Sequence, residues 1–121
     1  MKFVAVIIVM LLSINYAKAE EPMKTLEIVT FKAVEGTTDE QMITAAKQVE
    51  PVIKQMDGNI SRHFGKTPDG EWVDTVLWSN MDAAQAAAKQ IMSIPEFAPF
   101  GALIDGPSVK MRHVEIHSSI E

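Results

Sequence analysis

The sequence of 121 residues contains no cysteine, a single tyrosine and only two arginines. Without cysteine, the chain has no disulfide, no thiolate metal ligand, no cysteine nucleophile and no N-terminal cysteine for a lipid. The formal net charge is −5 at pH 7, which makes nucleic acid and anionic membrane surfaces poor partners for this chain. Stability must therefore come from packing within the chain or against another subunit.

Compact motifs that identify many enzymes are also missing from the sequence. It contains no glycine-rich phosphate loop and no Ser/His/Asp order typical of a hydrolase. Its histidines and acidic residues do not have the spacing of a metal site. We therefore predict neither a bound metal nor a cofactor, and the site has to be inferred from the fold.

The first 19 residues have the features of a secretory signal peptide. Lys2 supplies a positive start, Phe3–Leu12 is an unbroken apolar run, and a small-residue cleavage site of the A-x-A type ends at Ala19. An uncleaved anchor is the weaker alternative, because a membrane-spanning helix needs roughly 20 apolar residues. We predict cleavage after Ala19, a periplasmic or secreted location without membrane attachment, and one domain over residues 20–121.

Hydrophobic periodicity in the mature chain predicts four strands and two helices. The strands are expected at 25–34, 59–66, 71–79 and 109–117, and the helices from Thr38 to about Met56 and from about Asn80 to Ser93. The strand at 71–79 carries both tryptophans and has apolar or aromatic residues on both faces. Such a strand belongs in the centre of a sheet.

The first predicted helix has a clear start and an interruption. Thr38 and Gln41 have the spacing of a capping box. A proline inside a helix costs on the order of 3 kcal/mol and usually bends it. Pro51 therefore predicts a kink near Val49–Pro51.

The order strand–helix–strand–strand–helix–strand is that of the split βαβ, ferredoxin-like arrangement. Right-handed crossovers place the third strand between the first two. We expect an α+β fold whose four-stranded antiparallel sheet has the order 4-1-3-2, with both helices on one face. The opposite face is expected to hold Val29, Phe31, Val73, Thr75 and Leu77. This apolar surface is larger than monomers usually expose, and a second copy packed sheet against sheet would cover it, which predicts a homodimer.

The mature chain resembles the dimeric α/β barrel superfamily and, within it, antibiotic biosynthesis monooxygenase (ABM) domains. The matching stretches are Leu26–Phe31 followed by Gly36, Asp57-Gly58, Trp72–Trp78 running into Ser79–Ala87, and Pro95–Phe100. These motifs are structural, so they indicate the fold better than the activity. The resemblance implies a cofactor-independent oxygenase of a small aromatic or quinol substrate. The alternatives are a non-catalytic ligand-binding or stress-response homodimer and, less favoured, a haem-degrading protein.

Three positions test the resemblance to haem-degrading members. Those proteins have a tryptophan at the end of the third strand, an asparagine on the first strand and a histidine after the second helix. Trp78 matches the tryptophan, but Thr30 occupies the asparagine position and residues 95–104 contain no histidine. Ordinary haem degradation is therefore disfavoured. Thr30 remains a candidate substrate-binding residue and Trp78 a candidate catalytic residue, although a core tryptophan that supports the second helix is the commoner role for such a residue.

A histidine beside a carboxylate can act as a base toward an acidic phenol. We take His63 as the candidate base, Asp74 as the group that would orient it, and His113 as a candidate substrate-binding residue. The alternative is that both histidines are hydrogen-bonded sheet residues.

Two further pairs of residues have open interpretations. Arg62 and Arg112 could hold an anionic ligand, but pairing with Asp74 or Glu115 is the commoner arrangement for such residues. Phe97 and Phe100 are candidate substrate-binding residues, because a lid at this position would stack on a flat ligand. The alternative is that both phenylalanines fill the core.

Overall fold

The computed structural model describes residues 22–121, and the predicted signal peptide of residues 1–19 lies outside the described part. The elements in chain order are β1 (Thr25–Phe31), α2 (Asp39–Gln48), α3 (Glu50–Gln55), β2 (Asn59–Lys66), β3 (Trp72–Trp78), α4 (Met81–Ile91), η1 (Pro95–Phe97), α5 (Ala98–Gly101), η2 (Gly106–Ser108) and β4 (Lys110–Glu115). No helix among residues 22–121 is long and apolar enough to cross a membrane.

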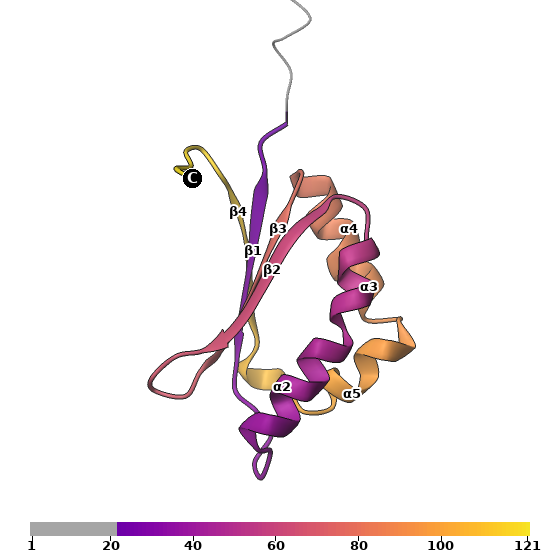
Figure 1. Ribbon diagram of the computed structural model, residues 1–121, viewed down its shortest axis with the longest axis vertical. Coiled ribbons are helices and arrows are strands. Elements are labelled where there is room, and N and C mark those ends of the chain that lie inside the picture. The colour runs from indigo at the N-terminus through magenta and orange to yellow at the C-terminus, as the bar shows by residue number, and fades with distance from the viewer. Residues whose placement is uncertain (1–21) are drawn as a thin grey trace, which may run out of the picture.

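The four strands form one antiparallel sheet in the order β2-β3-β1-β4. This is the predicted ferredoxin-like α+β topology, and β3 is an interior strand as expected. Figure 1 shows the helices gathered on one side of the sheet, while the other side is bare. The sheet therefore has a helix-facing side and an outer face.

Local sequence signals account for the bent helical segment after β1. The Thr38 hydroxyl oxygen accepts a hydrogen bond from the Gln41 N–H at 3.1 Å, and the Gln41 side-chain oxygen accepts from the Thr38 N–H at 2.9 Å. This is the predicted capping box. Val49 separates α2 from α3, and Pro51 lies in the first turn of α3, where a missing N–H costs little. The predicted kink is confirmed.

The register of the sheet decides which residues enter the core. Trp72, Val76 and Trp78 of β3 are buried toward the helices. Phe31 pairs with Trp72 in the antiparallel register and is only 1 % exposed, so the odd-numbered residues of β1 share the helix-facing side. The prediction that Val29 and Phe31 lie on the outer face is therefore wrong. Alternation divides the residues of a strand into two sets, but only the pairing with neighbouring strands decides which set faces the helices.

An aromatic cluster joins α5 to the sheet. The rings of Phe64 and Trp72 stack with centroids 5.2 Å apart. Phe100 packs edge-on against Phe31, Phe64 and Phe97, at centroid distances of 5.9, 5.7 and 5.7 Å. Edge-to-face pairs of this kind are favourable beyond the area that they bury. The cluster packs the segment that follows α4 against the sheet.

Candidate functional site

A cavity of about 460 Å³ lies between the helix-facing side of the sheet and the helices. Its size suits a small organic ligand. Its walls come from β1, β3, β4, α3, α4 and α5, and they are almost entirely apolar. Among the described residues that line it, only Glu27 and Asp74 are charged, and both are acidic. The exposed side chains of Met92, Val109 and Met111 mark its mouth.

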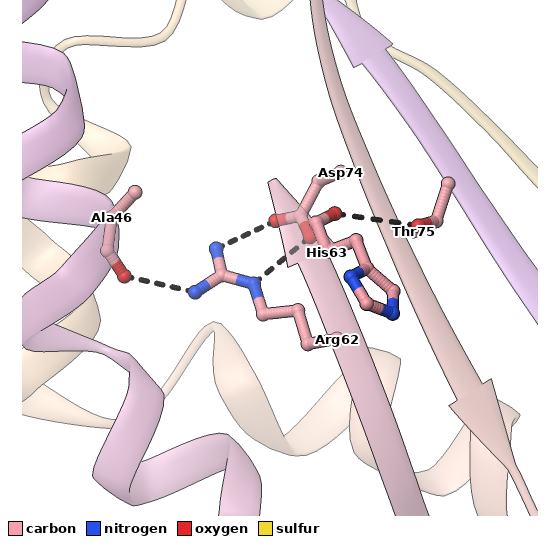
Figure 2. A network of polar contacts seen from close by, with 5 residues as sticks. All are labelled: Ala46, Arg62, His63, Asp74 and Thr75. Carbon is pink, nitrogen blue, oxygen red and sulfur yellow. Dashed lines mark hydrogen bonds and ion pairs between the residues drawn. The ribbon is translucent and has the colours of Figure 1, made fainter. Parts of the chain in front are cut away.

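Asp74 is fully engaged by Arg62 of the neighbouring strand. Arg62 donates from Nε to Asp74 Oδ1 at 2.9 Å and from Nη2 to Oδ2 at 2.8 Å, and its Nη1 donates to the Ala46 carbonyl at 2.8 Å (Figure 2). The guanidinium also lies over the rings of Phe64 and Phe100. Both carboxylate oxygens are therefore used, and the Arg62–Asp74 pair ties β2 and β3 to α2. This is the Arg62–Asp74 pairing that the sequence offered as an alternative.

His63 is separated from Asp74 by the sheet itself. It pairs with Thr75 on the outer face and is exposed. Figure 2 shows that only its carbonyl joins the neighbouring network, as an acceptor from the Thr75 hydroxyl. We expected Asp74 to orient His63, but adjacent positions of a strand point to opposite faces, so the two side chains do not meet. Neither does His63 line the cavity.

Glu27 presents the one carboxyl group in the cavity that is not held by an arginine. It lies on β1 opposite His113 of β4, and His113 Nε2 is 2.9 Å from Glu27 Oε1. Their side chains are 11 % and 17 % exposed. Glu27 lines the cavity, whereas His113 stands beside it on the edge strand and is not part of the lining. His113 therefore contacts the cavity through Glu27 rather than directly.

The surroundings of Glu27 change its affinity for a proton. Burial raises the pKa of Glu27 above its ordinary value of 4.5, and the negative charge of Asp74 raises it further. The hydrogen bond and charge of His113 lower the pKa, but burial has the larger effect. The Trp78 indole N–H also lowers the pKa of Glu27, although its Nε1 has no partner in hydrogen-bonding geometry among residues 22–121. Glu27 therefore exchanges its proton at a higher pH than a solvated glutamate.

The other candidates divide between the cavity and the outer face. Trp78, Phe97 and Phe100 line the cavity. Trp78 and Phe100 are buried and Phe97 is half-buried, so these rings are at once core and cavity wall. Thr30 pairs with Val73 on the outer face. Because neighbouring residues of a strand point to opposite faces, Thr30 lies away from the cavity while Phe31 lies toward it.

Glu27 is the residue that the sequence reasoning missed. It is the only charged residue in the stretch Thr25–Phe31, whose other residues are apolar or threonine. A single acid in a strand whose two faces both look buried is costly unless it is paired or functional, and that signal would have identified it.

Within residues 22–121, no group of three or more histidine, aspartate or glutamate side chains is placed to hold a metal ion.

No family model matches the chain, and no curated protein has a matching sequence. Solved structures are similar to it. A mutant of SnoaB, a cofactor-independent oxygenase from Streptomyces nogalater, has a TM-score of 0.65 at 12 % identity, over 80 % of this chain and 96 % of that chain. An antibiotic biosynthesis monooxygenase-like protein from Bordetella bronchiseptica gives 0.63 at 14 % identity, over 78 % and 97 %. The protein of unknown function NE2512 from Nitrosomonas europaea gives 0.63 at 15 %, over 84 % and 97 %.

These identities are low, so the likeness concerns the fold. It extends over nearly the whole of each neighbouring chain. The chain has the ferredoxin-like fold of the antibiotic biosynthesis monooxygenase-like proteins.

Proposed function

We propose that this chain binds a small, flat aromatic molecule in its cavity and is a cofactor-independent oxygenase of phenols or quinols. The observation that carries the proposal is the Glu27 carboxyl group in an otherwise apolar cavity of about 460 Å³. Such a cavity excludes water and holds an aromatic ring, while one polar group fixes the orientation of the ring. A fold neighbour described as a cofactor-independent oxygenase supports the same activity class.

The chemistry requires the substrate to lose a proton before it meets oxygen. Glu27 accepts the hydroxyl proton, and the resulting phenolate is rich enough in electrons to reduce O₂ directly. One oxygen atom stays on the ring, the other leaves as water, and the phenol becomes a quinone. The walls formed by Trp78 and Phe97 hold the ring in place. General acid–base catalysis of this kind contributes about 10²–10⁴-fold to a rate.

Oxygenation of 1-naphthol tests the proposal. The wild-type protein should convert it to 1,4-naphthoquinone, with oxygen uptake and one atom of ¹⁸O from ¹⁸O₂ in the product. Glu27→Gln removes the proton acceptor at nearly constant volume and should lower the rate about 10²–10⁴-fold. His63→Ala is the matched control on the opposite face. Equal rates for the wild type and Glu27→Gln would exclude Glu27 as the base.

A non-catalytic ligand-binding protein is the second candidate. It is favoured by the nearly unbroken apolar lining, which retains a ligand without any need for reaction. A molecule recovered from the purified protein by mass spectrometry, with no oxygen uptake, would support this candidate over the oxygenase. Haem is a poor ligand, since neither lysine nor arginine is found among the described lining residues to meet its carboxylates. Haem titration should therefore give no Soret shift.

We also propose a homodimer formed through the outer face. Leu26, Ile28, Val73 and Leu77 lie together on this face, and Val114 beside them is 43 % exposed. No helix of the described part covers them (Figure 1), and a second copy would remove this apolar surface from water. Leu77→Asp should shift the protein to monomer in sedimentation, because it would bury an unpaired charge. Thr44→Asp on the exposed side of α2 is the control.

Export is the last part of the proposal. Residues 1–19 have the charge, apolar run and cleavage site of a signal peptide. The mass of the protein recovered from the periplasm or medium should correspond to a chain that begins at Glu20. Recovery of the full-length chain from the cytoplasm would contradict export.

A further inference from the structure

We infer that Glu27 and His113 form a proton relay, through which a proton taken from the ligand in the cavity reaches the edge of the sheet. The relay rests on the proposed deprotonation at Glu27 and assigns the final acceptor, which the proposed function leaves open. His113 is thus a positioning and proton-accepting residue that acts through Glu27.

The two residues connect two different environments. Glu27 is on an interior strand and lines the cavity, whereas His113 is on the edge strand β4 and outside the lining. The 2.9 Å contact between Glu27 Oε1 and His113 Nε2 leaves Oε2 without a hydrogen-bond partner among residues 22–121, so this oxygen can take a ligand proton. The His113 side chain keeps 17 % of its surface exposed. Protons therefore have a route from an apolar cavity to water.

Charge balance explains why the relay needs the histidine. A protonated Glu27 can accept the ligand proton at Oε2 only if its own proton leaves Oε1, and His113 is the basic group within hydrogen-bond distance of that oxygen. In the relay, Glu27 begins as the carboxylic acid and its Oε1–H donates to His113 Nε2. The ligand O–H bond breaks as its proton passes to Oε2, while the Oε1 proton passes to Nε2. The products are a phenolate, a neutral Glu27 and an imidazolium, so atoms and charge balance.

The groups around Glu27 favour this distribution of charge. His113 faces it from β4, and Asp74 and Trp78 face it from β3. The residues that α3, α4 and α5 contribute to the cavity are apolar, so none of them titrates. The negative charge of Asp74 disfavours a second anion at Glu27. A dimer through the outer face would not cover the helix-facing side of the sheet, where both residues lie.

The relay is tested by the ionisation of a bound phenol, without any turnover. We choose 4-nitrophenol, whose phenol and phenolate absorb at different wavelengths, and titrate the complex against pH. His113→Ala should move the half-ionisation of the bound probe to higher pH by about one unit, which corresponds to a tenfold lower ratio of phenolate to phenol. Glu27→Gln should have an effect at least as large, because it interrupts the relay at its first step. Urea unfolding confirms that both variants are folded.

Chemical rescue separates a proton acceptor from a structural residue. Imidazole added to His113→Ala occupies the space at the sheet edge and should restore ionisation, and substituted imidazoles of higher basicity should restore more. His113→Gln fills that space and should not respond. Ionisation that is unchanged in His113→Ala, or that does not respond to imidazole, would overturn the relay. If ionisation depends on His113 but 1-naphthol is not oxygenated, the relay stands and the oxygenase proposal fails.

Discussion

Two acid–base pairs lie on the same side of the sheet, and they differ in how completely they are satisfied. Asp74 accepts at both oxygens from Arg62, whose third donor is used by the Ala46 carbonyl, and an arginine does not lose its charge in proteins. Glu27 shares a hydrogen bond at one oxygen with His113, whose imidazole can gain or lose a proton. The first pair is a cross-link and the second can exchange protons. Burial of a carboxylate therefore does not indicate function unless its partner leaves it free to titrate.

Removing Arg62 should give the largest effect. Arg62→Met leaves the Asp74 charge buried without a partner, and the free energy of unfolding should fall by about 3–5 kcal/mol in urea. His113→Phe is the matched variant of the other pair. Glu27 can hold a proton and stay neutral without this partner, so the loss should be only about 1–3 kcal/mol.

The double variant Arg62→Met, Asp74→Leu sharpens this prediction. It replaces the pair with apolar side chains, and replacements of buried ion pairs are often neutral or stabilising. The double variant should therefore be close to the wild type in stability. Equal losses in Arg62→Met and His113→Phe would contradict the contrast between the two pairs.

A pH-dependent difference in stability is expected at Glu27. Since the pKa of Glu27 is raised on folding, its contribution is fully present below pH 4.5, the ordinary pKa, and is lost as the pH rises through the folded-state value. Glu27→Gln cannot titrate and lacks this loss. The free energy of unfolding of Glu27→Gln, relative to the wild type, should therefore increase as the pH rises from about 4.5. Urea titrations over a pH series measure it, and a difference that stays constant with pH would place Glu27 in a solvated environment.

Local signals predicted much of the fold. The capping box at Thr38 and Gln41 and the interruption at Pro51 act over a few residues, and the order of elements restricts the topology to few arrangements. The arginine–aspartate pair was also foreseen as an alternative, since opposite charges on neighbouring strands tend to meet. These features depend on spacing within the chain, which the sequence displays directly.

The details of the site depend on which side of each strand faces the helices. Val29 and Phe31 were assigned to the outer face because alternation leaves two choices, and the choice depends on the register that β1 adopts with β3. Thr30 was expected in the site because of the family resemblance, and the same register turns it to the outer face. The histidines and tryptophans of the chain do not point to Glu27, whereas its position as the single charged residue of a mostly apolar strand does.

The smallest effect is expected at His63, the histidine on the other side of the sheet. Its exposed side chain contacts neither acid–base pair and does not line the cavity. His63→Ala should change the free energy of unfolding by less than about 0.5 kcal/mol and leave the affinity and ionisation of bound 4-nitrophenol unchanged. The comparison with His113→Ala is direct, because both variants remove one imidazole from a strand at the edge of the sheet. If the two variants lowered ionisation equally, proximity to Glu27 would not explain the effect, and His113 would lose its role as the proton acceptor.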